Sequence, residues 1–178
     1  MALKSTIYKA ELQVADMDRH YYGDHALTLA CHPSETEERL MVRLLAFALN
    51  AHSHLAFGRG LSDTDEPDLW RRDLTGVILD WIEVGQPDAR VLLKACGRAD
   101  RVRVYAYSAS TPIWWKQTAP KVARAKNLEA YAFDPEAVRA VAALANRNMR
   151  LQCTIQDGDM WLRDEADAVA IPMQRLET

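Results

Sequence analysis

The chain has 178 residues, a formal net charge of −3 and a pI near 5.9. Its apolar fraction of 49% is ordinary for a soluble globular protein, and its length favours one domain, residues 1–178. The charge excludes a global attraction for nucleic acid, so any such binding requires a local basic patch. Three scattered cysteines without a C-x-x-C pair exclude a disulfide framework and a zinc ribbon. Without an apolar run of about 20 residues or a signal-peptide core, we expect a cytoplasmic protein that does not enter the membrane.

The first fifty residues predict a strand pair and a helix. Residues 5–16 alternate between polar and apolar side chains, which predicts a half-exposed strand, and residues 25–31 form its partner across a turn. Ser34 is the expected N-cap of a helix that runs to about Asn50, and Glu37 completes a capping box. On this helix we expect a solvated charged face, formed at four-residue spacing by Glu35, Arg39 and Arg43.

The rest of the chain alternates strands and helices and ends in a hairpin. The expected strands are residues 54–59, 76–84, 101–108, 128–133, 149–156 and 160–163, and the expected helices are 87–100, 111–126 and 135–146. Residues 61–70 are expected to form an acidic loop, and Asp157-Gly158 is typical of a hairpin turn. The order predicts a mixed α/β or α+β domain with a mixed β-sheet flanked by helices.

The strand at 76–84 carries two carboxylates, Asp80 and Glu83, although it is otherwise apolar on both faces. Burying an ionised group costs several kcal/mol unless a partner compensates it, so these residues indicate a site. A regular strand places the two on opposite faces, where they share one metal only across a bulge. Glu83 therefore needs another partner, and Asp68 supplies one if the acidic loop folds over the strand end. Lys94, two turns into the next helix, points back toward that end.

Structural explanations compete with each of these functional interpretations. The carboxylates could belong to an inert ion-pair cluster, in which Glu83 pairs with a nearby arginine or lysine. Arg90, Lys94 and Arg98 form a basic stripe that is more often a solvated face. The pair Trp114-Trp115, which lysines and an arginine follow, suits nucleic-acid contact but more often anchors a helix to a core. Arg59 is either a phosphate clamp or a partner for the acidic loop.

Several segments together resemble the bacterial YaeQ family over essentially the whole chain. The matching segments are His32-Pro-Ser-Glu-Thr-Glu-Glu-Arg39, Phe57-Gly-Arg-Gly-Leu61, Asp65-Glu-Pro-Asp-Leu-Trp70, Trp81-Ile-Glu-Val-Gly-Gln-Pro-Asp-Ala-Arg-Val-Leu-Leu-Lys-Ala95, Ile113-Trp-Trp115 and Leu151-Gln-Cys-Thr-Ile-Gln-Asp-Gly-Asp-Met-Trp-Leu162. The resemblance implies a variant of the PD-(D/E)XK nuclease core. Pro67-Asp68 matches the first part of that pattern, and Glu83 matches the acid of the second part. Glycine stands at position 85 where the pattern has lysine, and Lys94 could fill that place from the helix.

If this site is active, the resemblance implies metal-assisted hydrolysis of nucleic-acid phosphodiesters. Asp68 and Glu83 would hold Mg²⁺, Lys94 would orient the attacking water or neutralise developing charge, and Glu38 would match the acid on the first helix of many such nucleases. The alternative is a non-catalytic module on the same fold that binds nucleic acid or a protein of the transcription machinery. The displaced lysine and the acidic pI favour this alternative, whereas the carboxylates beside a basic helix favour catalysis.

Overall fold

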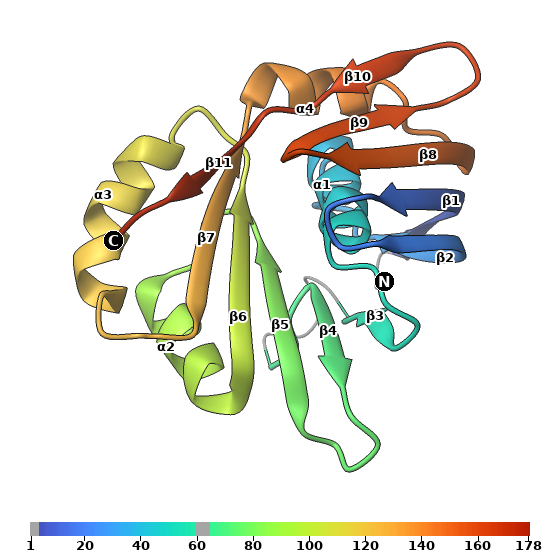
Figure 1. The fold of residues 1–178 in the computed structure, drawn as a ribbon. Helices are drawn as coiled ribbons and strands as arrows, with labels where there is room; N and C mark the ends of the chain where they lie inside the picture. Colours follow the sequence, from blue (N-terminus) through green and yellow to red (C-terminus); the bar gives the residue numbers. More distant parts are fainter. Residues whose placement is uncertain (1–3, 60–64) are drawn as a thin grey trace. The chain divides into compact units, whose positions relative to one another are not determined.

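The computed structural model describes residues 4–59 and 65–178, and Figure 1 shows its fold. The chain divides into two compact units, which we describe separately. The first unit comprises Met1–Ala51 and Glu136–Met173, and the second comprises His52–Pro135 and Gln174–Thr178. The expectation of a single domain stays a prediction. Within the described ranges, no helix is both long enough and apolar enough to cross a membrane.

The first unit is built on a five-stranded mixed sheet with the order β10-β9-β8-β1-β2. Its elements are β1 (Thr6–Asp16), β2 (Tyr21–Cys31), α1 (Glu37–Leu49), α4 (Pro135–Ala142), β8 (Asn148–Gln156), β9 (Asp159–Arg163) and β10 (Ala168–Ala170). β1 pairs antiparallel with β2 and parallel with β8, so segments more than 100 residues apart contribute to one sheet. The predicted apolar face of β1 is confirmed, because Ala10, Leu12 and Val14 are buried.

The second unit is built on a six-stranded mixed sheet with the order β11-β7-β6-β5-β4-β3. Its elements are β3 (Leu55–Phe57), β4 (Leu69–Arg72), β5 (Ile78–Val84), α2 (Ala89–Arg98), β6 (Ala99–Ala106), α3 (Thr111–Val122), β7 (Leu128–Phe133) and β11 (Met173–Leu176). β5, β6 and β7 run parallel, whereas β4 is antiparallel to β5. One hydrophobic cluster joins the two helices to one face of the sheet, and it includes Trp81, Leu92, Val102 and Trp115.

The prediction of a mixed α/β fold is confirmed, with the strands divided between two sheets rather than gathered in one. Three short strands were not predicted: β4 lies in the region expected to be an acidic loop, and β10 and β11 follow the terminal hairpin. Residues 61–64 of the expected acidic loop lie outside the described residues. The predicted turn of the hairpin is confirmed, because Asp157 and Gly158 both have positive φ between β8 and β9.

The start of α1 corrects two predictions. The N-cap is Thr36, whose hydroxyl accepts from the backbone N–H of Arg39 at 3.1 Å, whereas the Ser34 hydroxyl lies 2.7 Å from His32 Nδ1. Ser34 therefore belongs to the turn before the helix, and the capping box with Glu37 is wrong.

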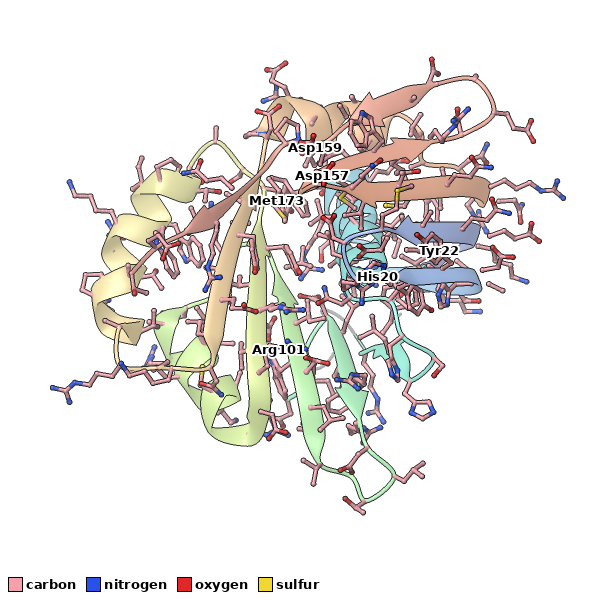
Figure 2. The ribbon with its side chains drawn as sticks, viewed as in Figure 1. His20, Tyr22, Arg101, Asp157, Asp159 and Met173 are labelled. Atoms are coloured by element: carbon pink, nitrogen blue, oxygen red, sulfur yellow. The ribbon has the colours of Figure 1, made fainter. Side chains whose placement is uncertain are left out.

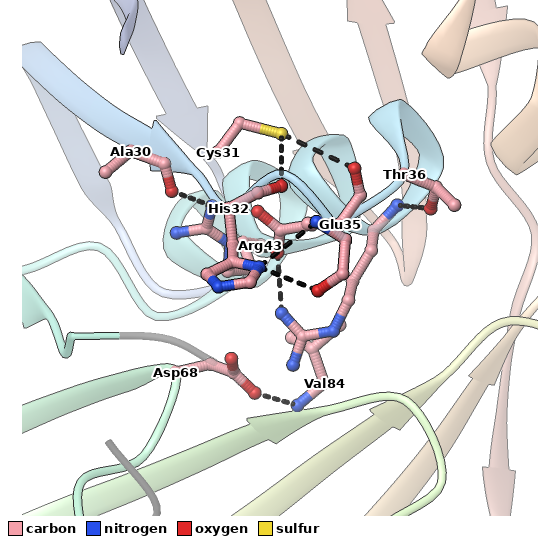
Figure 3. Close-up of polar contacts among 10 residues, drawn as sticks. Ala30, Cys31, His32, Glu35, Thr36, Arg43, Asp68 and Val84 are labelled. Atoms are coloured by element: carbon pink, nitrogen blue, oxygen red, sulfur yellow. Dashed lines mark hydrogen bonds and ion pairs between the residues drawn. The ribbon is translucent and has the colours of Figure 1, made fainter. Parts of the chain in front are cut away.

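The charged group of α1 is also not a solvated face. Glu35 and Arg43 have side chains only 2% and 3% exposed, and Arg43 contacts both Glu35 oxygens (Figure 3). Arg39 adds a 2.6 Å contact to the same carboxylate, and Arg43 also donates to the Ala30 carbonyl at 3.0 Å. The prediction failed because Glu35 precedes the helix, and its carboxylate is buried against the two arginines.

Candidate functional site

Asp68 immediately precedes β4 and is 4% exposed, so it is buried in the second unit. Its Oδ2 accepts a hydrogen bond of 2.8 Å from the backbone N–H of Val84 (Figure 3). Gly58 fixes the backbone of Asp68, because the Gly58 N–H donates to the Asp68 carbonyl at 2.9 Å. A Cβ added to Gly58 would lie 2.0 Å from the Pro67 carbonyl oxygen. The close approach of the chain at Gly58 therefore fixes the position of Asp68.

Glu83 lies on β5, on the strand that pairs with β4. Leu69 of β4 faces Ile82 of β5, and Asp68 and Glu83 are the next residues in that antiparallel register. Opposite residues of such a pair have Cβ atoms about 4.5–5.5 Å apart. The Glu83 Oε1 accepts a hydrogen bond of 2.9 Å from the indole N–H of Trp81, two residues earlier on the same face. This donor sets the orientation of the carboxylate, and the two-residue spacing on a strand is the sequence signal that points to it.

Asp80 lies on the opposite face of β5 from Glu83, as the strand period predicted. Its two oxygens accept from Arg71 Nε at 2.7 Å and from Arg101 Nε at 2.9 Å, and Arg101 is labelled on β6 in Figure 2. Burial alone would raise the pKa of Asp80, but the hydrogen bonds and charges of the two arginines outweigh it, and its pKa lies below the ordinary value. Asp80 is therefore the centre of a structural ion triad.

Lys94 is on α2, and its ammonium group lies 3.4 Å from the carboxylate of Asp65 in the segment before β4. Its side chain is 66% exposed, so this contact is a weak surface pair. Arg98, one turn further along α2, donates to the backbone carbonyl of Asp65 at 3.1 Å. Arg90, the third residue of the stripe, has a side chain 93% exposed. The stripe is therefore mostly solvated, with two of its members bound to the segment at Asp65.

Position 85 explains why lysine is absent from the end of β5. Gly85 has a φ of 101°, a conformation that side chains other than glycine rarely adopt, and its N–H donates to the Tyr105 carbonyl at 2.8 Å. In the nuclease pattern the lysine at this place lies on an extended strand. In this chain β5 ends at Val84, and the backbone has left the extended conformation at Gly85.

Glu38, the fourth predicted site residue, belongs to the first unit. It lies in the first turn of α1 and is half-buried, and a carboxylate there is stabilised by the helix dipole. Of the four predicted residues, Asp68 and Glu83 are neighbours in sequence register, because Asp68 immediately precedes β4 and Glu83 follows Ile82, the β5 partner of Leu69. The structure places Lys94 on the neighbouring helix of the same unit. The roles predicted for all four stay predictions.

The donor chemistry of Asp68 and Glu83 fits a magnesium ion. Mg²⁺ takes hard oxygen ligands and is commonly bound by one or two carboxylates, with water and substrate phosphate completing the octahedron. Across residues 4–59 and 65–178, no group of three or more His, Cys, Asp or Glu side chains is arranged to hold a metal. A site here would therefore rely on two carboxylates, and the hydrogen bonds from Trp81 and Val84 would hold those ligands in place.

The other candidate groups have structural explanations. The indoles of Trp114 and Trp115 donate to the carbonyls of Pro87 and Glu177, which anchors α3 to its unit. The backbone N–H of Arg59 donates to the Glu66 carboxylate at 3.0 Å, so Arg59 is bound to the acidic segment. Cys31 and Cys153 are buried and Cys96 is half-buried, and none forms a disulfide. Burial raises the pKa of the Cys153 thiol to about 12.

Comparison with known proteins decides the family. A family model described as "YaeQ protein" matches residues 1–173. The chain therefore belongs to the YaeQ family. It is 48% identical over 173 residues to the "Uncharacterized protein YaeQ" of Escherichia coli (strain K12), covering 96% of this chain and 95% of that protein. It is 49% identical over 175 residues to the protein of the same name from Salmonella typhi, covering 97% and 96%.

Solved structures of YaeQ proteins have the same fold. The crystal structure of the protein from Xanthomonas axonopodis pv. citri is similar with a TM-score of 0.94 and 48% identity, over 98% of this chain and 99% of that one. The crystal structure from Pseudomonas syringae gives a TM-score of 0.94 at 39% identity, over 98% and 97%. The YaeQ resemblance predicted from the sequence segments is confirmed, and the relation to the PD-(D/E)XK nuclease core stays a prediction.

Proposed function

We propose that this YaeQ-family protein is a Mg²⁺-dependent phosphodiesterase that acts on nucleic acid, with Asp68 and Glu83 as the metal ligands. The observation that carries the proposal is the buried Asp68 carboxylate, which accepts from the Val84 N–H, in a residue that lies opposite Glu83 when the register of β4 and β5 is continued by one residue. Burying a carboxylate costs free energy, and a metal-binding role would account for a buried carboxylate at this place.

Side chains and backbone groups of the protein would orient the metal ligands and neutralise the charge that develops on the phosphate. When bound, Mg²⁺ supplies Lewis-acid polarisation of a phosphoryl oxygen and lowers the pKa of a coordinated water. Trp81 and Val84 hold the two carboxylates in fixed orientations, which reduces the reorganisation required when the ion arrives. Lys94 is exposed on a flexible side chain, and exchange of its weak contact with Asp65 for a phosphate oxygen would place a positive charge beside developing negative charge.

One observation favours a second candidate, a non-catalytic module that binds nucleic acid or a transcription protein. The conformation of Gly85 leaves the usual lysine position without a side chain, and Lys94 is paired with Asp65 on the surface. A site without a fixed lysine can retain a metal or a phosphate without cleaving it.

The test is a calorimetric titration of Mg²⁺, then Mn²⁺, into the wild type, Asp68→Asn and Glu83→Gln. Asp68→Asn keeps an oxygen acceptor for the Val84 N–H, so it removes charge with little change in structure. The matched control is Asp100→Asn, an exposed carboxylate of the same unit. We expect saturable binding in the wild type and the control, and its loss in both site variants. A screen for metal-dependent cleavage of DNA and RNA follows.

Equal metal binding by wild type and site variants would contradict the assignment of Asp68 and Glu83. Metal binding without cleavage of any DNA or RNA substrate would favour the non-catalytic module.

A further inference from the structure

Two arginines and two tryptophans form a continuous row on the helix-bearing face of β4 and β5, and we call these four residues the Trp–Arg row. The Arg72 guanidinium carbon lies 4.3 Å from the ring centroid of Trp70. Trp70 meets Trp81 edge to face, with centroids 6.1 Å apart. Arg98, from the end of α2, lies over the Trp81 ring at 4.8 Å.

The Trp–Arg row is exposed at its cationic members and buried at its centre. Arg72 and Arg98 are exposed, Trp70 is half-buried, and Trp81 is 3% exposed. Core packing therefore explains Trp81, and it explains Trp70 in part. It does not explain why the exposed Arg72 of β4 lies over Trp70, or why the exposed Arg98 of α2 lies over Trp81 while it also donates to the Asp65 carbonyl.

The Trp–Arg row is also continuous with Glu83. Trp81 donates its indole N–H to the Glu83 carboxylate at 2.9 Å, so a molecule seated on the row lies next to that side chain. Lys94 is one turn before Arg98 on α2 and adds a third exposed cation to the same edge.

Alternating cations and aromatic rings suit an unpaired nucleic-acid strand. Guanidinium groups contact phosphates and present a flat face on which bases stack. The half-buried indole of Trp70 adds a ring with which any base can stack, whereas the buried Trp81 only supports the row. In a duplex the bases are stacked on each other, so a double-stranded ligand would use only the charges. A protein partner with an acidic surface would also use the charges without the rings.

We infer that the Trp–Arg row binds single-stranded nucleic acid and directs the strand toward Asp68 and Glu83. The inference rests on the proposed function for the chemistry at those carboxylates. The binding itself requires no metal, which allows the two to be tested apart.

The experiment measures fluorescence anisotropy of a labelled 12-nucleotide thymidine strand and of a matched duplex, in EDTA, over a range of salt concentrations. The variants are Arg72→Gln, Arg98→Gln, Trp70→Leu and Trp70→Phe, and Arg124→Gln is the control because it removes an exposed arginine of the same unit away from the row. Circular dichroism spectra verify that each variant is folded.

We expect the single strand to bind the wild type more tightly than the duplex does. Trp70→Leu should weaken binding about tenfold, and Trp70→Phe should retain most of it because the ring remains. Each arginine variant should lower the slope of log K against log salt by about 0.7, the value of one single-strand phosphate contact, while Arg124→Gln leaves it unchanged.

Three outcomes would overturn the inference: no binding of either oligonucleotide by the wild type, equal binding of strand and duplex, or row variants that behave like Arg124→Gln. Strand binding at the row without metal-dependent cleavage would leave the inference standing and count against the phosphodiesterase. Metal-dependent cleavage that is unchanged in the row variants would support the phosphodiesterase and count against the inference.

Discussion

Three carboxylates around β5 are held by three different kinds of donor. Asp80 accepts from two arginines, Glu83 from an indole N–H and Asp68 from a backbone N–H. The two full positive charges at Asp80 stabilise its ionised carboxylate strongly. Asp80 therefore serves the fold, and Asp68 is the second carboxylate of the proposed site.

Replacing Asp80 with asparagine tests the structural triad. We expect the free energy of unfolding to fall by about 3 kcal/mol at pH 7, because two arginines lose a buried partner. The folded-state pKa of Asp80 is lowered below its ordinary value of 3.8, so its contribution is present above that value and is lost as the pH falls through the folded pKa. Urea unfolding should therefore show a large difference in the free energy of unfolding between the wild type and Asp80→Asn at pH 7. This difference should be smaller at pH 3. A difference independent of pH would contradict the triad, and Asp100→Asn is the exposed control.

Two glycines in the second unit make a matched pair. Gly58→Ala should destabilise the protein by about 3 kcal/mol and weaken any metal binding, because its Cβ would lie 2.0 Å from the Pro67 carbonyl and displace Asp68. At Gly97, in α2, an added Cβ would meet no atom within 4 Å apart from its chain neighbours and the backbone of its own helix, so Gly97→Ala should stabilise the protein by about 0.5–1 kcal/mol. Thermal unfolding measures the stability of both variants, and the Mg²⁺ titration measures their metal binding. Similar effects from the two changes would refute the positioning role of Gly58.

At the scale of elements, α1 offers a direct test of its capping residue. Thr36→Ala should lower the free energy of unfolding by about 1 kcal/mol, because the Arg39 N–H loses its acceptor. Ser34→Ala should have a smaller effect, since Ser34 contacts His32 in the turn before the helix and does not cap it. Chemical denaturation of the two variants decides which residue caps the helix. A larger loss of unfolding free energy in Ser34→Ala than in Thr36→Ala would identify Ser34 as the N-cap.

The elements that were predicted correctly are those that local pattern determines. The alternation of residues 5–16, the turn at Asp157-Gly158 and the apolar run at 128–133 each lie within one segment, and the structure has them at nearly the expected bounds. The burial of Glu35 could not be predicted, because it depends on Arg43 two turns away and on the carbonyl of Ala30. Short strands such as β4 and β10 depend on the neighbour with which they pair.

The candidate site shows the same division between local and distant information. The strand period separated Asp80 from Glu83 correctly. The choice of Asp68 as the second acid, which Pro67-Asp68 suggested, stays a prediction. The contact of Lys94 with Asp65 joins residues 29 positions apart, so no local spacing could reveal it. The close approach at Gly58 depends on how the chain folds back before β4, which no periodic pattern encodes.

For the molecule as a whole, the chain passes between the two units three times, after Ala51, Pro135 and Met173. The second unit is therefore completed only by the last residues, where β11 lies beside β7 and the Glu177 carbonyl accepts from the Trp115 indole at 2.8 Å. These final residues lie beyond the segment that the family model matches.

Removing residues 174–178 should weaken the second unit and leave the first largely unchanged. We expect amide hydrogen exchange to speed up in β7 and α3, because the edge strand and the indole acceptor are lost, while β1 and β8 keep their protection. Glu177→Ala is the control, since it retains the backbone carbonyl. Uniform loss of protection in both units would contradict this expectation.

The parallel pairing of β1 with β8 also sets an order of events during synthesis. The apolar face of the β1–β2 hairpin is complete at Cys31, but β8 begins at Asn148, 117 residues later (148 − 31). At about 5–20 residues per second, a ribosome needs roughly 6–23 s to make that stretch. For that interval the nascent hairpin has a sheet edge without its partner, so the time of greatest risk for aggregation comes before the chain is finished.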